Sequence, residues 1–199
     1  MSISTAQERT PKKRRYRLGK RAEKQRETRR RIVEAAVELH GTIGPARTSI
    51  AQIAERAGVQ RHTFYAHFPD EGSLLRACSG LSLERDPLPD PEQWLGDPPG
   101  IRRLKRGLEE LYGWYERNAE LTGCVLRDAD HHPPTREIVG LRMAPVFERS
   151  AEILGEGLND RGRALLATAL DFACWRALRR AVSSRNAAEL MSEAVAALG

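Results

Sequence analysis

Residues 48–68 decide how this chain folds, and they read TSIAQIAERAGVQRHTFYAHF. Ser49 and Gln52 have the spacing of a capping box, in which each side chain bonds the other residue's backbone at the start of a helix. Apolar residues then recur at i, i+3, i+4 and i+7 until Gly58, which is expected to end the helix. A second short helix follows, from about residue 60 to 67. Two short helices joined at a glycine predict a helix-turn-helix.

The second of these helices has an unusual composition for a helix that only packs. Val59, Phe64 and Phe68 are available for a core, whereas the remaining side chains are polar and long or ring-bearing. These polar residues are Gln60, Arg61, His62, Thr63, Tyr65 and His67. Such side chains reach base edges or phosphates when a helix enters the major groove of DNA. Arg61 is the first candidate for base readout, because arginine pairs bidentately with guanine.

The excess positive charge of the chain lies at its beginning. The net charge is +6, and residues 1–31 hold 13 Lys and Arg residues against three Glu residues. Residues 1–25 are therefore expected to form a flexible basic arm, with Arg14, Arg15 and Arg17 as candidates for contact with a polyanion. The alternatives are a tail that only aids solubility, a membrane-surface contact, or an architectural protein whose arm binds DNA without sequence preference.

The rest of the pattern predicts an all-α protein. We expect a helix-turn-helix domain over residues 26–80 and a second helical domain over 81–199. Helical periodicity begins near Glu27, and five prolines between residues 85 and 100 predict a loop. The later helices are expected at about 101–115, at 135–154 with a kink at Pro145, at 161–182 and at 186–198.

Several function classes are excluded or disfavoured. No run of apolar residues is long enough to cross a bilayer, and the charged start does not resemble a signal peptide. The three cysteines are far apart and form no CxxC pair, so we expect a soluble cytoplasmic protein without a disulfide framework. No pairing of nucleophile and base, phosphate loop or metal-ligand cluster is visible, so neither an enzyme nor a metal or other cofactor is predicted.

Residues 32–75 resemble the N-terminal domain of TetR-type bacterial transcriptional regulators. The residues that carry the resemblance are Ala35, Ala36, Leu39, Gly44, Thr48, Ser49, Ile50, Ile53, Ala54, Ala57, Gly58, Val59, Thr63, Phe64, Tyr65, His67, Phe68, Leu74 and Leu75. The resemblance implies a homodimer that places its two recognition helices in successive major grooves of a roughly palindromic operator. It further implies ligand-responsive regulation, most simply repression.

The resemblance also assigns roles to single residues. Tyr65 and His67 match positions that touch phosphates, and Thr63 matches a position near the backbone or a base. Thr48 and Ser49 match the start of the first helix of the motif, which often touches a phosphate. Gln60, Arg61 and His62 match the variable positions that read sequence. Glu71 departs from the family, because many members have a phosphate-binding lysine there; we hypothesise that the basic arm compensates for it.

For the second domain the resemblance implies an effector pocket and a dimer interface. The dimer is expected to form through the helices at about 161–182 and 186–198, with an ordinary monomer core as the alternative. The pocket would take an apolar or aromatic small molecule, if it takes any. Its candidate lining comes from aromatic and methionine-bearing helices: Tyr112, Trp114, Tyr115, Met143, Phe147, Phe172 and Trp175.

Overall fold

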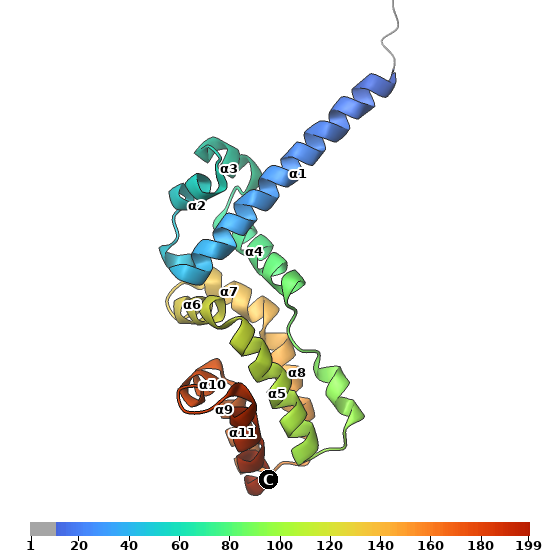
Figure 1. Cartoon of the computed structure of the whole chain (residues 1–199), viewed down its shortest axis with the longest axis vertical. Helices are drawn as coiled ribbons and strands as arrows, with labels where there is room; N and C mark the ends of the chain where they lie inside the picture. The colour runs from blue at the N-terminus through green and yellow to red at the C-terminus, as the bar shows by residue number, and fades with distance from the viewer. Residues whose placement is uncertain (1–10) are drawn as a thin grey trace, which may run out of the picture.

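Residues 11–199 fold into α-helices and two short 3-10 helices. The computed structural model describes residues 11–199, with side chains from Gly19 onward, and it contains no β-strand within that range. Figure 1 shows an elongated molecule with α1 to α4 at one end, α9 to α11 at the other and α5 to α8 between them. This arrangement confirms the all-α prediction of a helix-turn-helix domain followed by a helical domain.

The N-terminal domain contains the predicted helix-turn-helix. Its elements are α1 (Pro11–Thr42), η1 (Pro45–Arg47), α2 (Ile50–Ala57), α3 (Arg61–His67) and α4 (Glu71–Arg85). Their apolar faces close over one small core built around Ile32, Ile53, Phe64, Phe68 and Leu74. This core holds α3 against α1 and α4 while the other face of α3 remains exposed.

The first helix is much longer than its apolar periodicity predicts. It begins at Pro11 and not near Glu27, so residues 11–25 belong to α1, which corrects the expected boundary between arm and helix. Residues 1–10 of the expected arm lie outside the described part of the chain. The reason for the difference is that residues 19–27 are exposed, and an exposed helix needs no apolar stripe. Lys, Arg, Glu and Gln, which dominate this stretch, are good helix formers.

The C-terminal domain packs around α5. Its elements are η2 (Pro91–Gly96), α5 (Ile101–Arg117), α6 (Ala119–Ala129), α7 (Pro133–Arg142), α8 (Ala144–Leu154), α9 (Asp160–Leu170), α10 (Phe172–Leu178) and α11 (Ser184–Leu198). Within the described residues no helix is both long and apolar enough to cross a membrane. Helix α5 lies along α11, and the core between them is rich in leucine and aromatic side chains.

Three segments of this domain differ from the sequence-based expectation. The proline-rich stretch 85–100 is not only a loop, because η2 forms within it and buries Trp94 completely. The helix expected over 135–154 is divided at Met143 into α7 and α8, so Pro145 lies in the first turn of a new helix where a kink was predicted. Proline fits the first turn of a helix, where its missing N–H has no partner to lose.

The third difference is the helix expected over 161–182, which is interrupted at Asp171. The Asp171 carboxylate accepts the Ala173 N–H at 2.6 Å and so caps α10. The carbonyls of Ala169 and Leu170 accept hydrogen bonds from the hydroxyls of Tyr112 and Tyr115, at 2.8 and 2.6 Å. In an unbroken helix these carbonyls would bond backbone N–H groups four residues on, so the tyrosines stabilise the break.

Helix α4 joins the two domains. It runs through residue 80, where the boundary was expected, and ends at Arg85. Helix α4 also packs against α7, and α1 packs against α6. The two domains therefore share a broad junction as well as a connecting helix.

Candidate nucleic-acid interface and junction cavity

Helix α2 begins with the predicted capping box. The Gln52 N–H donates to Ser49 Oγ at 3.3 Å, and the Ser49 N–H donates to Gln52 Oε1 at 2.8 Å. The Thr48 hydroxyl just before it donates to the Gly44 carbonyl at 2.7 Å. These bonds fix the start of α2, and they already engage both hydroxyl groups, because Ser49 Oγ also donates to Gln52 Oε1.

The turn between α2 and α3 depends on Gly58. This residue is left-handed, with φ 64° and ψ 41°, a conformation that is costly for residues with a Cβ. The N–H groups of Gly58 and Val59 both donate to the Ala54 carbonyl, and these bonds close the end of α2. The turn sets the angle at which α3 leaves the domain.

Two arginines of α1 anchor the motif, and the sequence pattern did not reveal them. Arg29 Nη1 donates to the His67 carbonyl at 2.9 Å, and its guanidinium lies 4.1 Å from the centre of the Phe68 ring. Arg31 Nη1 donates to the Ala57 carbonyl at 3.1 Å. Cations at the carboxyl ends of helices bind free carbonyls and oppose the helix dipole. Both arginines lie just before the apolar stripe of α1, but the other basic residues around them obscured this signal.

The predicted sequence-reading residues lie on the outer face of α3. Gln60, Arg61 and His62 are exposed, and Gln60 gives no capping bond to the helix that it precedes. Among the described residues, neither Gln60 nor Arg61 makes a side-chain hydrogen bond or ion pair within the chain. Their polar groups are therefore available to a partner molecule.

The predicted phosphate-contacting residues form a second group beside the first. Thr48, Ser49 and Tyr65 line one hollow of about 380 Å³ between the starts of α2 and α4. Tyr65 is exposed, with its ring against the edge of Phe64, whereas Thr63 and His67 are half-buried. The side chains of Arg14, Arg15 and Arg17 lie outside the described residues. Glu71 is half-exposed at the first turn of α4, 3.4 Å from His132 Nε2.

Hydrogen bonds between the end of α6 and the segment around η1 connect the two domains. The Asp128 carboxylate is buried and accepts the Ala46 N–H at 2.9 Å. Arg127 donates to the same carboxylate at 2.8 Å and to the Ile43 carbonyl at 3.1 Å. A Cβ on Gly44, whose φ is 93°, would overlap both side chains, so glycine is required there. Among the described residues, no cluster of three or more potential metal ligands occurs.

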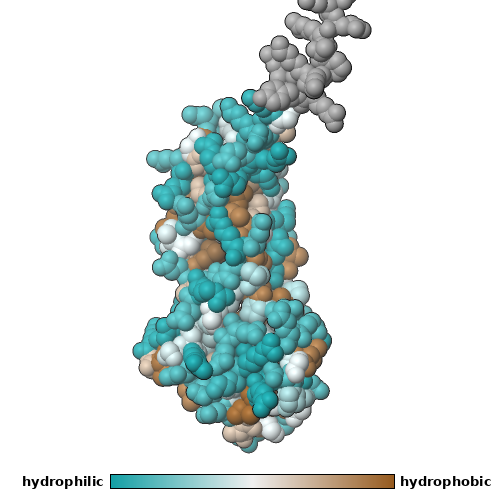
Figure 2. Space-filling model, turned by 45° about the vertical axis from the view of Figure 1, so that its right-hand side comes forward, coloured by the Kyte–Doolittle hydropathy of each residue, from teal (hydrophilic) through white to brown (hydrophobic). Residues whose placement is uncertain are grey.

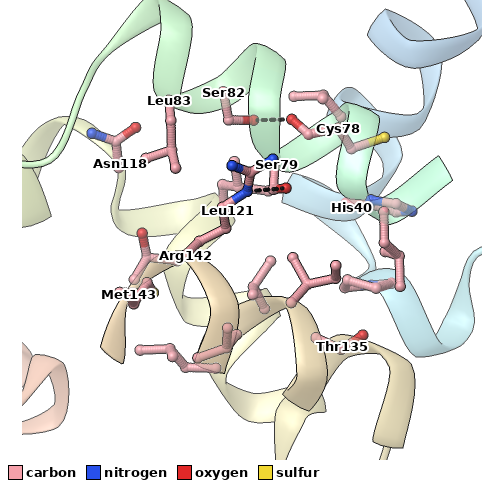
Figure 3. Close-up of a pocket in the computed structure, with 18 of the residues that line it drawn as sticks. His40, Cys78, Ser79, Ser82, Leu83, Asn118, Leu121, Thr135, Arg142 and Met143 are labelled. Carbon is pink, nitrogen blue, oxygen red and sulfur yellow. Dashed lines mark hydrogen bonds between the residues drawn. The ribbon is translucent and has the colours of Figure 1, made fainter. Parts of the chain in front are cut away.

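A cavity of about 100 Å³ lies at this junction (Figure 3). Its walls come from α1, η1 and α4 of the first domain and from α5, α6 and α7 of the second, so it spans both. Most of the lining is apolar; its polar members include His40, Ser79, Asn118 and Arg142. Figure 2 shows a largely hydrophilic exterior with hydrophobic surface gathered at mid-height of the molecule.

Most of the predicted pocket residues lie elsewhere. Met143 and Trp114 line the cavity, but the other candidates belong to the core of the C-terminal domain. These are Tyr112, Tyr115, Phe147, Phe172 and Trp175. Burial raises the pKa of Tyr112 and Tyr115, and both hydroxyls are bonded to α9 carbonyls. These five aromatic residues thus pack in the core of the C-terminal domain. The cavity is lined mainly by residues of α4, α6 and α7 that had no distinctive pattern in the sequence.

His40 is one of two buried titratable groups in the cavity wall; the other is Cys78, whose thiol pKa is raised by burial to about 12. His40 is 5% exposed, and burial lowers its pKa to about 4; Asp128 opposes this shift and His132 adds to it. The imidazole is therefore neutral near pH 7.

Known proteins resemble this chain most clearly in the helix-turn-helix. Residues 32–78 match the family model of bacterial regulatory proteins, tetR family. The HTH-type transcriptional regulator TtgR of Pseudomonas putida is 46% identical over 55 residues, which are 28% of this chain and 26% of TtgR. The HTH-type transcriptional repressor KstR of Mycolicibacterium smegmatis is 33% identical over 107 residues, 53% of this chain and 52% of KstR. The chain thus spans about a quarter to a half of these relatives.

The fold likeness extends over both domains. The transcriptional regulator FadR of Bacillus subtilis, solved in complex with stearoyl-CoA, has a TM-score of 0.58. The superposition covers 83% of this chain and 96% of FadR at 17% identity, so it concerns the fold. A helix-turn-helix with an exposed second helix, followed by an all-helical domain, is an arrangement found in DNA-binding regulators of transcription. The helix-turn-helix domain of this chain thus matches the tetR family of bacterial regulatory proteins.

Proposed function

We propose that this protein is a ligand-responsive transcriptional repressor that binds a palindromic operator as a homodimer. The observation that carries the proposal is the outer face of α3, where Gln60 and Arg61 are exposed and make no bond within the described chain. Long polar side chains without internal partners are suited to base edges in a major groove. Arg61 would pair bidentately with a guanine, and Gln60 and His62 would read neighbouring positions.

Phosphate contacts would surround this reading face. Tyr65, His67 and Thr63 lie on α3, and Thr48 and Ser49 lie at the start of α2. Because the Thr48 and Ser49 hydroxyls already donate within the chain, a phosphate there would first meet the N–H groups at the start of α2. These contacts position the protein, whereas Gln60, Arg61 and His62 specify the sequence.

The basic start of the chain would supply the contact that Glu71 cannot. The first turns of α1 extend away from the domain (Figure 1), and Arg14, Arg15 and Arg17 within them would track phosphates or the minor groove. Removing residues 1–20 should weaken operator binding. It should also lower the log–log salt dependence by about 0.9 for each phosphate that the shortened protein no longer binds. An unchanged affinity and slope would contradict this role.

Dimerisation would use the outer faces of α9 and α11. Ala164 and Ala167 on α9 and Leu190 and Ala197 on α11 are exposed, although they are apolar. Leu190 and Ala197 lie seven residues apart and therefore on one face of α11. Two such helices from each subunit would form an intersubunit four-helix bundle.

The effector would bind in the junction cavity. A ligand that fits only one arrangement of the two domains shifts the population toward that arrangement. The FadR complex contains stearoyl-CoA, but a cavity of about 100 Å³ is far smaller than the ~300–1,000 Å³ of typical ligand sites, so we expect a much smaller molecule here.

Selection of genomic DNA fragments on the purified full-length protein, at near-physiological salt, tests the proposal. Enrichment of one or a few inverted repeats would support a dimeric, sequence-specific regulator and would supply the operator. Broad retention without a shared motif, decreasing steeply as salt increases, would instead indicate an architectural DNA-binding protein dominated by its basic arm.

A further inference from the structure

The junction cavity carries one positive charge and no negative one. Among the described residues that line it, none is Asp or Glu, and the histidine, His40, is neutral near pH 7. Arg142 is the remaining ionisable cation in its wall. An unbalanced cation beside apolar surface favours a ligand of opposite charge.

Several N–H groups of the Arg142 guanidinium have no acceptor within the described chain. Its Nε donates to Ser79 Oγ at 3.3 Å and its Nη2 to the Arg76 carbonyl at 3.5 Å, both at the long limit of a hydrogen bond. Within the described chain no carboxylate lies at ion-pair distance from it. A guanidinium has five N–H donors in a planar fork, so at least three are unused. Figure 3 shows the side chain extending from α7 towards Ser79 of α4, across the cavity.

The arginine is half-buried, which makes its lack of a counter-ion more significant. Two other basic side chains of the junction have carboxylate neighbours: Arg127 bonds Asp128, and His132 lies beside Glu71. Charge-assisted, bidentate bonds between a guanidinium and a carboxylate are shorter and about twice as strong as neutral ones. A bound carboxylate would replace two long bonds by two such short ones.

The rest of the cavity determines the size and polarity of the uncharged part of the ligand. Leu75, Leu121 and Val125 contribute apolar surface, with no further charged group to hold a second anionic centre. Cavities of about 150 Å³ accept a benzene ring, and this one is somewhat smaller, about 100 Å³. A single ring or a short branched chain fits this space after a small adjustment of the walls.

We propose that the junction cavity binds a compact monocarboxylate, with the carboxylate on Arg142 and the apolar body among the side chains of α4 and α6. The proposal rests on the effector role given to this cavity above and names the class of the effector. Arg142 and Ser79 come from different domains, so the ligand would bridge α7 to α4, the helix that follows the helix-turn-helix.

The test compares three carboxylates with their neutral amides: benzoate, phenylacetate and cyclohexanecarboxylate against benzamide, phenylacetamide and cyclohexanecarboxamide. Thermal shift and titration calorimetry on the full-length protein should give at least one carboxylate that binds tenfold or more tightly than its amide. Equal binding of acid and amide, or no binding of any of the three carboxylates at millimolar concentration, overturns the proposal.

Variants then assign the preference to Arg142. Arg142→Gln should abolish the preference for acid over amide, and Arg142→Lys should retain part of it, because lysine keeps the charge without the fork. Arg102→Gln is the matched control, since Arg102 is exposed on α5 and away from the cavity. A preference that survives in Arg142→Gln overturns the assignment; if that variant does not fold, the lysine variant and the acid–amide pairs on the unaltered protein still decide it.

Operator binding measured in the same samples separates the two proposals. Specific DNA binding without carboxylate binding would overturn the ligand class and leave the DNA-binding function standing. Carboxylate binding without any effect on operator binding would support the ligand class and contradict ligand-responsive repression.

Discussion

In the proposed function, Arg61 is the side chain on which sequence reading by α3 would most depend. It is exposed, it lies at the first turn of α3 and its donors have no partner within the described chain. Arg61→Ala should weaken binding to the selected operator by about 1–3 kcal/mol, roughly 5- to 150-fold, with little change on unrelated DNA. Fluorescence anisotropy with both DNAs measures this difference.

The control for this prediction is Arg102→Ala, which removes an exposed arginine from α5. If Arg61→Ala weakens binding to operator and unrelated DNA equally, Arg61 contacts phosphate and does not read a base.

His40 gives the folded protein a specific sensitivity to acid. Its pKa is about 4 in the folded state and about 6.5 when the chain is unfolded, so the unfolded state binds the proton more readily. Its contribution to stability is therefore complete above about pH 6.5 and decreases as the pH falls towards 4, by about 3 kcal/mol in total. In His40→Gln this part of the acid dependence should be absent.

Urea unfolding between pH 7 and pH 4.5 checks this prediction. His131→Gln serves as the control, because His131 is exposed. Parallel pH profiles for the unaltered protein and His40→Gln would show that the buried imidazole is not the source.

At the scale of elements, the turn at Gly58 tests how much one left-handed backbone conformation contributes to the stability of the fold. A Cβ there meets nothing closer than 3.7 Å, so Gly58→Ala tests backbone strain without a steric clash. The substitution should lower the free energy of unfolding by about 1–2 kcal/mol. Gly113→Ala, in the interior of α5 with ordinary contacts, should instead raise it by about 0.5–1 kcal/mol. Chemical denaturation of both variants gives the comparison, and decreases of equal size would refute the conformational explanation.

The elements that the sequence predicted well are those whose signals are local. Ser49, Gln52 and Gly58 define α2 through neighbours within a few residues, and the structure confirms the cap and the turn. The break at Asp171 was missed because the two tyrosines that bond the Ala169 and Leu170 carbonyls come from α5, more than 50 residues away. The start of α1 was missed because residues 19–27 are exposed, and apolar periodicity is informative only where a helix packs.

The candidate site likewise has a part that local sequence signals could predict and a part that they could not. Residues on the outer face of α3 could be predicted, since one helix presents all of them. The cavity could not be predicted, because its walls come from six elements and its lining residues, such as Arg142 and His40, are ordinary members of amphipathic helices. The pocket was predicted among aromatic residues instead, and two of these, Tyr112 and Tyr115, make long-range hydrogen bonds in the core.

At the scale of the whole molecule the central prediction is the dimer. Leu190 is 49% exposed on the outer face of α11, where the proposed bundle would cover it. Leu190→Glu should convert the protein from a dimer to a monomer of 22.3 kDa, because a buried charge without a partner is strongly destabilising. Sedimentation velocity distinguishes the two states.

Leu141→Glu is the matched control for the dimer, since Leu141 is equally apolar and 56% exposed on α7. It should leave the sedimentation coefficient unchanged. A dimer that persists in Leu190→Glu, or one that dissociates in Leu141→Glu alone, would place the interface elsewhere.

Because α1 is long, a small rotation at its cavity end produces a large displacement at its other end. Val37 and His40, near its carboxyl end, line the cavity, and its 32 residues extend about 48 Å. Turned as a stiff rod about that end, the helix moves its far end by about 4 Å for each ~5° of rotation. That displacement exceeds the step of about 3.4 Å from one base pair to the next. In the proposed repressor the helix would act as a lever arm, converting a side-chain-sized change at the cavity wall into loss of register along the DNA.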